Sequence, residues 1–140
     1  MRQLLLTVPA VVSVAVGAVI GAPIAHGDNK RLNDAVVANL YTIQHQAGCT
    51  NDVTISPQLQ RAAERHTRDV LNNRDLAGDI GSDGSTPQDR AKAAGFQGRV
   101  AETVAINAAL AISGVELISR WHDNPAYLAI MSDCDHPHIG

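Results

Sequence analysis

Two carboxylates, Asp79 and Glu102, are the side chains whose type and spacing first suggest chemistry. They flank a loop of glycine, serine, aspartate and threonine, residues 81–86, which leads into a helix predicted to begin at Pro87. Thr86 is the expected N-cap of this helix, because its hydroxyl can accept a hydrogen bond from a free N–H group and proline is favoured at the first helical position. A loop held in this way is a suitable place for a site.

Glu102 is predicted to lie on the apolar face of a strand formed by residues 100–106. A carboxylate on such a face needs a partner, since burying an unpaired charge is costly. Two interpretations stay open: Glu102 accepts hydrogen bonds from a backbone turn, or it acts with Asp79 as an acid/base pair. Oxygen atoms of Asp79 and Glu102, together with Asn124, could also hold a divalent cation weakly.

His66 is a further candidate, on the buried stripe of a helix expected to begin at Pro57 with Ser56 as its N-cap. This histidine is either a core residue that is hydrogen-bonded to a carbonyl or carboxylate, or a site residue. We favour the core interpretation, because burial selects a neutral, hydrogen-bonded imidazole. The opposite face of the helix carries Arg65 and Asp69, which are spaced to pair with each other at a solvated surface.

The sequence contains two cysteines, Cys49 and Cys134. In an exported chain an even number of cysteines predicts a disulfide. This one would close a loop of about 85 residues. The alternative, a reactive or metal-binding thiol pair, is less favoured because the two cysteines are not closely spaced.

The first 27 residues have the pattern of a secretory signal peptide. Arg2 precedes an uncharged stretch with an apolar centre, small residues stand at Ala25 and Gly27, and the chain then becomes polar. We predict cleavage after Gly27, which leaves residues 28–140 as one domain that is secreted or held in the cell envelope. Contact with the membrane would then be transient. An uncleaved membrane anchor is the alternative, since the apolar stretch is long enough to span.

The composition is typical of one globular domain, with 45% hydrophobic residues, 18% charged residues and a net charge of −3. The chain has no basic cluster and only 3% aromatic residues, which argues against nucleic-acid binding. The last residues, with His136 and His138, are expected to fray. Helices are predicted over residues 28–46, 56–71, 87–94, 107–123 and 125–131.

Several motifs, taken in order, resemble the CAP superfamily (cysteine-rich secretory, antigen 5 and pathogenesis-related 1 type domains), in particular its short bacterial secreted members. The most specific match is the loop at 81–85 followed by Pro87, Arg90 and Gly95. The other matching positions, in chain order, are residues 39–41, 47–48, 57–66, Glu102, Trp121, Pro125 and Ile130. Together they cover nearly all of the chain after the signal peptide.

The resemblance implies an α+β fold, namely an α-β-α sandwich in which helices flank a small antiparallel sheet. Because relatives usually continue beyond the position of Gly140, the sheet is expected to lack its last strand or strands. The resemblance also implies a surface cleft, which in many members carries two histidines and two acidic residues and can bind a divalent metal.

Matched residue by residue, the cleft keeps little of that metal chemistry. Asp79 and Tyr127 stand where the two histidines would be, Glu102 matches one acidic position, and Asn124 stands near the other. We therefore expect no cofactor, and at most a weakly bound divalent cation at Asp79 and Glu102. The candidate residues of the cleft are Asp79, Glu102, Asn124, Tyr127 and His66.

Members of this family are mostly secreted binding proteins. The resemblance therefore implies a non-catalytic domain that binds a lipid- or sterol-like ligand, or a protein partner outside the cell or in a host. One alternative is a hydrolase, metal-dependent or not, that uses Asp79 and Glu102. Another is a degenerate relative with only a structural or antigenic role. No nucleophile elbow or zinc-protease motif supports catalysis, so we expect no enzymatic activity.

Overall fold

The computed structural model describes residues 29–107 and 112–140. Its helices are α1 (Lys30–Gln46), α2 (Pro57–Asn72), α3 (Pro87–Ala93), α4 (Gly114–His122) and α5 (Pro125–Met131), and its strands are β1 (Thr54–Ile55) and β2 (His138–Ile139). This mixture of helices with a small sheet confirms the α+β class. The predicted signal peptide lies outside the described residues. No helix in the described ranges is long and apolar enough to cross a membrane.

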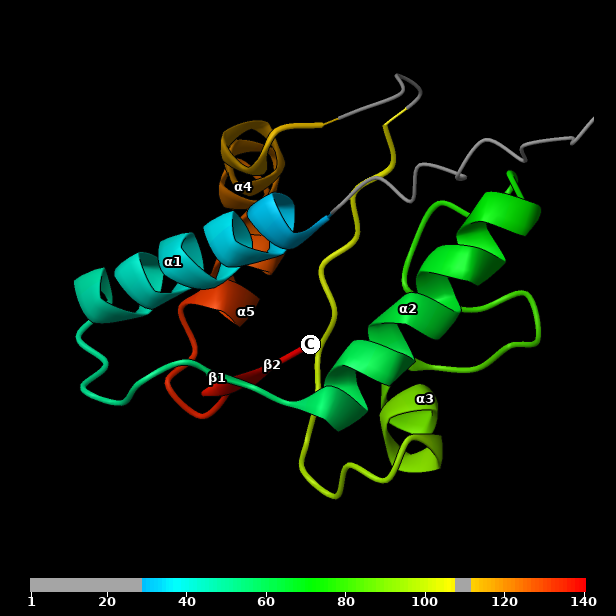
Figure 1. Cartoon of the computed structure of the whole chain (residues 1–140), viewed down its shortest axis with the longest axis horizontal. Helices are drawn as coiled ribbons and strands as arrows, with labels where there is room; N and C mark the ends of the chain where they lie inside the picture. The colour runs from blue at the N-terminus through cyan, green and yellow to red at the C-terminus, as the bar shows by residue number, and fades with distance from the viewer. Residues whose placement is uncertain (1–28, 108–111) are drawn as a thin grey trace, which may run out of the picture.

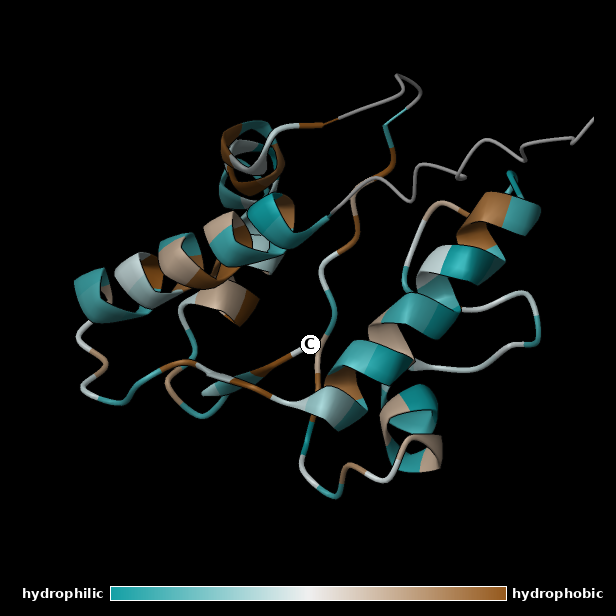
Figure 2. Cartoon of the chain, viewed as in Figure 1, coloured by the Kyte–Doolittle hydropathy of each residue, from teal (hydrophilic) through white to brown (hydrophobic). Residues whose placement is uncertain are grey.

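The helices form two groups that the small sheet joins (Figure 1). Helix α1 packs against α4 and α5, and α4 packs against α5. Helix α2 packs against α3 and against β2. Figure 2 shows α2 and α3 mostly in hydrophilic colours, so the second group has fewer apolar side chains to bury. Because β1 precedes α2 and β2 follows α5, the pairing of these strands fastens the two groups together.

Each group has a small buried core. Ala62 of α2 and Ala91 of α3 are buried in one, and α4 and α5 contribute Leu117, Ile118 and Met131 to the other. Gly114, the first residue of α4, allows α4 to approach α1 closely, since a Cβ there would lie 2.6 Å from the Cβ of Ala35.

Three of the helices begin at the predicted residues, Pro57, Pro87 and Pro125. Ser56, Thr86 and Asn124 are the N-caps of α2, α3 and α5, and each is followed by a proline at the first helical position. Their side-chain oxygens accept hydrogen bonds from N–H groups that the first turn leaves free. At α3 the arrangement is a reciprocal capping box, in which Thr86 and Asp89 bind each other's backbone N–H groups.

The two strands run parallel, with Thr54 opposite His138 and Ile55 opposite Ile139. The backbone N–H of Ser56 donates to the oxygen of Ile139 at 2.7 Å. The sequence analysis expected an antiparallel sheet and a frayed C-terminal tail, and for this described pair of strands both expectations are wrong. The residue pattern along one strand does not indicate whether its partner runs parallel or antiparallel to it. Here that direction depends on the disulfide between Cys49 and Cys134.

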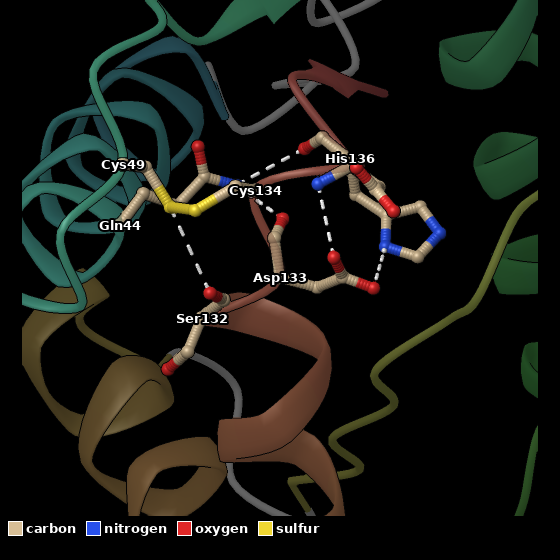
Figure 3. The surroundings of a disulfide bond; sticks show 7 residues. Gln44, Cys49, Ser132, Asp133, Cys134 and His136 are labelled. Atoms are coloured by element: carbon tan, nitrogen blue, oxygen red, sulfur yellow. Dashed lines mark hydrogen bonds and ion pairs between the residues drawn. A yellow bond between two sulfur atoms is a disulfide. The ribbon is translucent and has the colours of Figure 1, made fainter.

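Cys49 and Cys134 form the predicted disulfide, which joins the turn after α1 to the turn after α5 (Figure 3). Strand β1 starts shortly after Cys49, and β2 starts shortly after Cys134. Both strands therefore leave one covalent junction side by side, which accounts for their parallel direction. A disulfide of this kind is typical of proteins that fold in an oxidising compartment.

Gln44 completes this junction (Figure 3). Its side chain is fully buried, and its Nε2 donates to the backbone oxygens of Asp133 at 3.4 Å and His136 at 3.0 Å. The Asp133 carboxylate accepts a hydrogen bond from the N–H of Asp135 at 2.9 Å and lies 3.0 Å from His136 Nδ1. These bonds hold the tail in an ordered turn that leads into β2.

The strand expected at residues 100–106 does not form within the described part of the chain. The segment runs as an extended trace (Figure 1), from α3, where Arg90 binds Glu102, to α4, where Arg120 binds the oxygen of Ile106. Alternating apolar residues predict an extended, half-buried chain, but a strand also needs a neighbour for its backbone hydrogen bonds.

The helix predicted from Asn107 begins later, at Gly114, with Ser113 as its N-cap. The Ser113 hydroxyl accepts a hydrogen bond from the N–H of Glu116 at 3.1 Å. Serine and asparagine are both good N-caps, so sequence alone could not decide between the two positions. Residues 108–111 of the predicted helix lie outside the described residues.

Replacing both cysteines with alanine should lower the free energy of unfolding by about 4 kcal/mol, because the disulfide closes a long loop in the unfolded chain. Urea denaturation followed by circular dichroism measures this difference. In the oxidised, unreduced protein neither cysteine should react with an alkylating agent. Alkylation of both thiols without prior reduction would contradict the disulfide.

Candidate functional site

Arg90 of α3 is the residue around which the site is organised. Its side chain is only 2% exposed. It donates from Nη1 to the oxygen of Ser85 at 2.7 Å, from Nη2 to the oxygen of Asp79 at 2.6 Å, and from Nη2 to the Glu102 carboxylate. One buried guanidinium therefore binds both the loop before α3 and the extended segment after it.

The capping box places Arg90. The N–H of Asp89 donates to Thr86 Oγ1 at 3.2 Å, and Asp89 Oδ2 accepts from the N–H of Thr86 at 3.0 Å. Hydrogen bonds from Thr86, first from its hydroxyl and then from its N–H, lower the pKa of Asp89 and keep this cap ionised. Because Arg90 follows Asp89 directly, the capped turn sets the direction in which its side chain leaves the helix.

The two carboxylates that the sequence singled out meet at Arg90 but do not form a free pair. Glu102, with 19% of its side chain exposed, is held in the ion pair with Arg90. Asp79 contributes its backbone oxygen, and its carboxylate makes no hydrogen bond to any other described residue. The structure thus gives Glu102 a structural partner, although a guanidinium rather than a backbone turn.

A cleft of about 220 Å³ lies between α2 and the loop 81–86. The sequence pattern predicted that Arg65 and Asp69 pair with each other, but each of them binds the loop instead. Arg65 Nη2 donates to Asp83 Oδ2 at 2.8 Å, and Asp69 accepts from the N–H of Ser82 at 2.7 Å and from its hydroxyl at 2.6 Å. The lining, entirely polar or charged, consists of Arg65, His66, Asp69, Ser82, Asp83, Ser85 and Arg90.

These contacts keep the two aspartates of the cleft ionised. Hydrogen bonds from the hydroxyl and the N–H of Ser82 lower the pKa of Asp69. Hydrogen bonds from Ser85, together with the charge of Arg65, lower the pKa of Asp83 to about 2. The charges of this cleft are therefore already bound to one another or to the loop.

His66 lies on the wall of this cleft and is 2% exposed. Its Nε2 is 2.9 Å from the oxygen of Gly78, so Nε2 carries the proton and donates it, because a carbonyl can only accept. Its Nδ1 has no hydrogen-bond partner among the described residues. The bond to Gly78 is the kind of core interaction that we favoured for this histidine.

The structure does not bring Asn124 and Tyr127 to this site. Asn124 caps α5, where its Oδ1 accepts from the N–H groups of Ala126 at 3.0 Å and Tyr127 at 3.3 Å. Tyr127 is half-buried on the same helix. Helix α5 belongs to the group of α1 and α4, whereas His66, Asp79 and Glu102 are arranged around α2 and α3 (Figure 1).

A metal centre has no ligand set in residues 29–107 and 112–140. No group of three or more histidine, cysteine, aspartate or glutamate side chains there is placed to hold an ion. Of the three oxygen ligands considered, Glu102 is bound to Arg90, and Asn124 is bound to the first turn of α5. Asp79, Glu102 and Asn124 are therefore not brought together as one set of ligands.

A second cleft, of about 310 Å³, lies where β1, the beginning of α2 and the turn after α3 meet. It has apolar side chains in its lining, contributed by Ile55, Pro57 and Phe96. The ring of Phe96 meets the ring of His138 edge-on, with 6.2 Å between the ring centres. Ile55 is 46% exposed, so this cleft offers apolar surface to solvent.

The central role of Arg90 was not predicted from the sequence. The sequence nevertheless contained a signal for it. Arg90 stands beside Ala91 on the buried face of α3, and Glu102 stands on the apolar face of an extended segment. Two opposite charges, each on a face that should be apolar, suggest each other as partners. The cleft at Phe96 could not be found in this way, because it depends on the pairing of β1 with β2.

No protein-family model, curated protein or solved structure matches this chain. The function is therefore argued from the sequence pattern and from the geometry of the two clefts.

Replacing Arg90 with alanine should lower the free energy of unfolding by about 3–5 kcal/mol, because Glu102 and two backbone oxygens would lose their buried partner. Arg65→Ala is the matched control. It breaks an ion pair whose side chains are 55% and 52% exposed, and it should cost less than about 1 kcal/mol. Urea denaturation compares the two, and equal losses would contradict the central position of Arg90.

The lowered pKa values of Asp69 and Asp83 predict a pH dependence of stability. A group with a depressed folded-state pKa stabilises the protein above its unfolded-state pKa, and this contribution is lost as the pH falls through the folded-state value. The free energy of unfolding should therefore decrease between about pH 4 and about pH 2. Asp83→Asn should weaken this decrease, because it removes one of the carboxylates whose pKa is lowered. An unchanged pH profile in Asp83→Asn would refute the assignment.

Proposed function

We propose that this chain is a secreted CAP-type domain that acts by binding, and that it holds a lipid- or sterol-like ligand in the cleft beside Phe96. The contrast between the two clefts carries the proposal. In the cleft at Arg90 the charged groups are bound to one another and to the loop, whereas the other presents Ile55, Pro57 and Phe96. Burying apolar ligand surface there would contribute roughly 25 cal/mol for each Å².

The CAP-type fold is part of this proposal. Support comes from the mixed helices and sheet, from the disulfide, and from the way in which Arg90 and Glu102 join two of the motifs on which the resemblance depends. In this proposal the helical groups are the outer layers of the sandwich. Secretion follows from the predicted signal peptide, and a disulfide is what an exported domain would carry.

The size of the cleft suggests how much of a ligand it holds. Its volume of about 310 Å³ is near the lower end of the range for pockets that take drug-sized molecules, which begins at roughly 300 Å³. A section of an acyl chain or part of a sterol ring system fits this volume. A polar end group would find hydrogen-bond partners in the polar part of the lining, which comprises Thr54, Ser56, Gln58, Gln97 and His138.

The ion pair at Arg90 argues against the hydrolase alternative. If Glu102 served as a general base with Asp79, its carboxylate would have to leave Arg90 during the reaction. That movement would leave a guanidinium that is 2% exposed without its counter-charge, which is strongly unfavourable. The Glu102→Gln variant should therefore lose stability, and no hydrolytic activity should depend on it.

Native mass spectrometry of the disulfide-bonded protein, incubated with a panel of membrane phospholipids, fatty acids and sterols, should show an adduct with one ligand per chain. Phe96→Asp should weaken this binding at least tenfold, because it places a charge against the apolar ligand. The matched control is Leu71→Asp, which introduces the same charge at an apolar residue that is 67% exposed and outside the cleft. This control should bind as the unsubstituted protein does.

The absence of any adduct across the panel would exclude ligand binding and would favour a structural or antigenic role. Equal loss of binding in Phe96→Asp and Leu71→Asp would show that the ligand lies elsewhere. Circular dichroism of each variant separates a loss of binding from a loss of folding.

A further inference from the structure

The extended segment after Gly98 has two edges, and side chains of Gln88 and Arg120 bind the two ends of one of them. In an extended chain the N–H and C=O groups of successive residues point to opposite edges. On the edge of the even-numbered residues, Gln88 donates to the oxygen of Gly98 at 3.0 Å and accepts from the N–H of Val100 at 3.1 Å. Farther along the same edge, Arg120 donates to the oxygen of Ile106 at 3.3 Å.

The edge of the odd-numbered residues, which we call the free edge, comprises Ala101, Thr103 and Ala105. Their backbone groups make no hydrogen bond to any other residue in the described ranges. Ala101 is exposed, and Thr103 and Ala105 are half-buried. A row of unpaired N–H and C=O groups is a template for a further strand.

We propose that the free edge binds the free edge of a second copy of this chain, as an antiparallel pair centred on Thr103. In this register Thr103 faces its own counterpart, and Ala101 faces Ala105 of the other copy. All of these are odd-numbered positions, so each facing pair exchanges two backbone hydrogen bonds, about six in total. A two-fold axis through Thr103 relates the two copies and closes the assembly as a dimer.

The side chains support a second copy as the partner. Threonine opposite threonine is a favourable cross-strand pair. On the other face of the segment, Val100 would face Ile106 of the other copy, and Glu102 would face Val104. The one charge inside the pairing region, Glu102, is neutralised by Arg90 of its own chain, so no like charges oppose each other. Depletion of charge at the centre is characteristic of protein interfaces.

The expected dimer is reversible. One pair of strands buries less surface than the roughly 1,200–2,000 Å² of a stable interface. Association should therefore depend on concentration over the micromolar to millimolar range, which sedimentation velocity can follow from about 5 μM to about 500 μM.

Thr103→Pro is the decisive variant. Proline lacks the N–H at the centre of the pair, but it is compatible with an extended backbone, and no described hydrogen bond of the single chain uses this N–H. The variant should associate at least tenfold more weakly than the unsubstituted protein. Thr103→Val is the matched control, because it keeps both the N–H and the β-branched shape, and it should associate as before.

Hydrogen exchange provides a second readout on the unsubstituted protein. Raising the concentration should slow exchange of the amides of Ala101, Thr103 and Ala105, and leave those of Glu102 and Val104 unchanged. A monomer across the whole concentration range, or association of Thr103→Pro that equals that of Thr103→Val, would overturn the proposal. If Thr103→Pro does not fold, the exchange pattern decides, and protection that does not alternate along the segment also overturns it.

Discussion

The covalent bond between Cys49 and Cys134 is the constraint on which the arrangement of the chain depends. Neither helical group has a large apolar core, and few side chains in the described residues are fully buried. The disulfide brings the turns after α1 and α5 together, and Gln44 fills the space beside it with hydrogen bonds instead of apolar contacts. From this junction β1 and β2 leave side by side, and their pairing connects the two groups. A small core supported by a covalent link is a common solution in exported domains.

Arg90 holds together the group of α2 and α3, as the disulfide holds together the group of α1, α4 and α5. A buried guanidinium is stable only when its donors are satisfied, and the loop and the extended segment supply the acceptors. Gly81 is needed for this arrangement, since a Cβ there would lie 2.7 Å from Ser85 Oγ and 2.8 Å from Asp83 Oδ1. The charged groups of the loop that we first interpreted as a place for a site are thus bound within the protein. We therefore propose the cleft that contains Ile55, Pro57 and Phe96 as the place for a ligand.

Local signals in the sequence predicted local structure well, and contacts between distant residues were the features that they missed. The caps Ser56, Thr86 and Asn124 act within one helical turn, so their effect could be inferred from neighbouring residues alone. The extended segment shows the limit of this reasoning. Its alternating pattern was identified correctly, but the pattern contains no information about which strand, if any, lies beside it. Arg65 and Asp69 are spaced to pair on a helix, and only the folded loop shows that each has a better partner.

The pairing of β1 with β2 also has a consequence for the order of folding. The strands are joined by contacts between residues far apart in the sequence, Thr54 with His138 and Ile55 with Ile139. Contacts of this kind form slowly, because a long loop must close before they stabilise anything. Helix α2 and its capped neighbour α3 can form as soon as they are synthesised, but strand pairing joins them to the group of α1 only after β2 has been synthesised. The two groups can therefore be joined only after β2 has been made, and a delay in forming the Cys49–Cys134 bond delays the strand pairing that connects them.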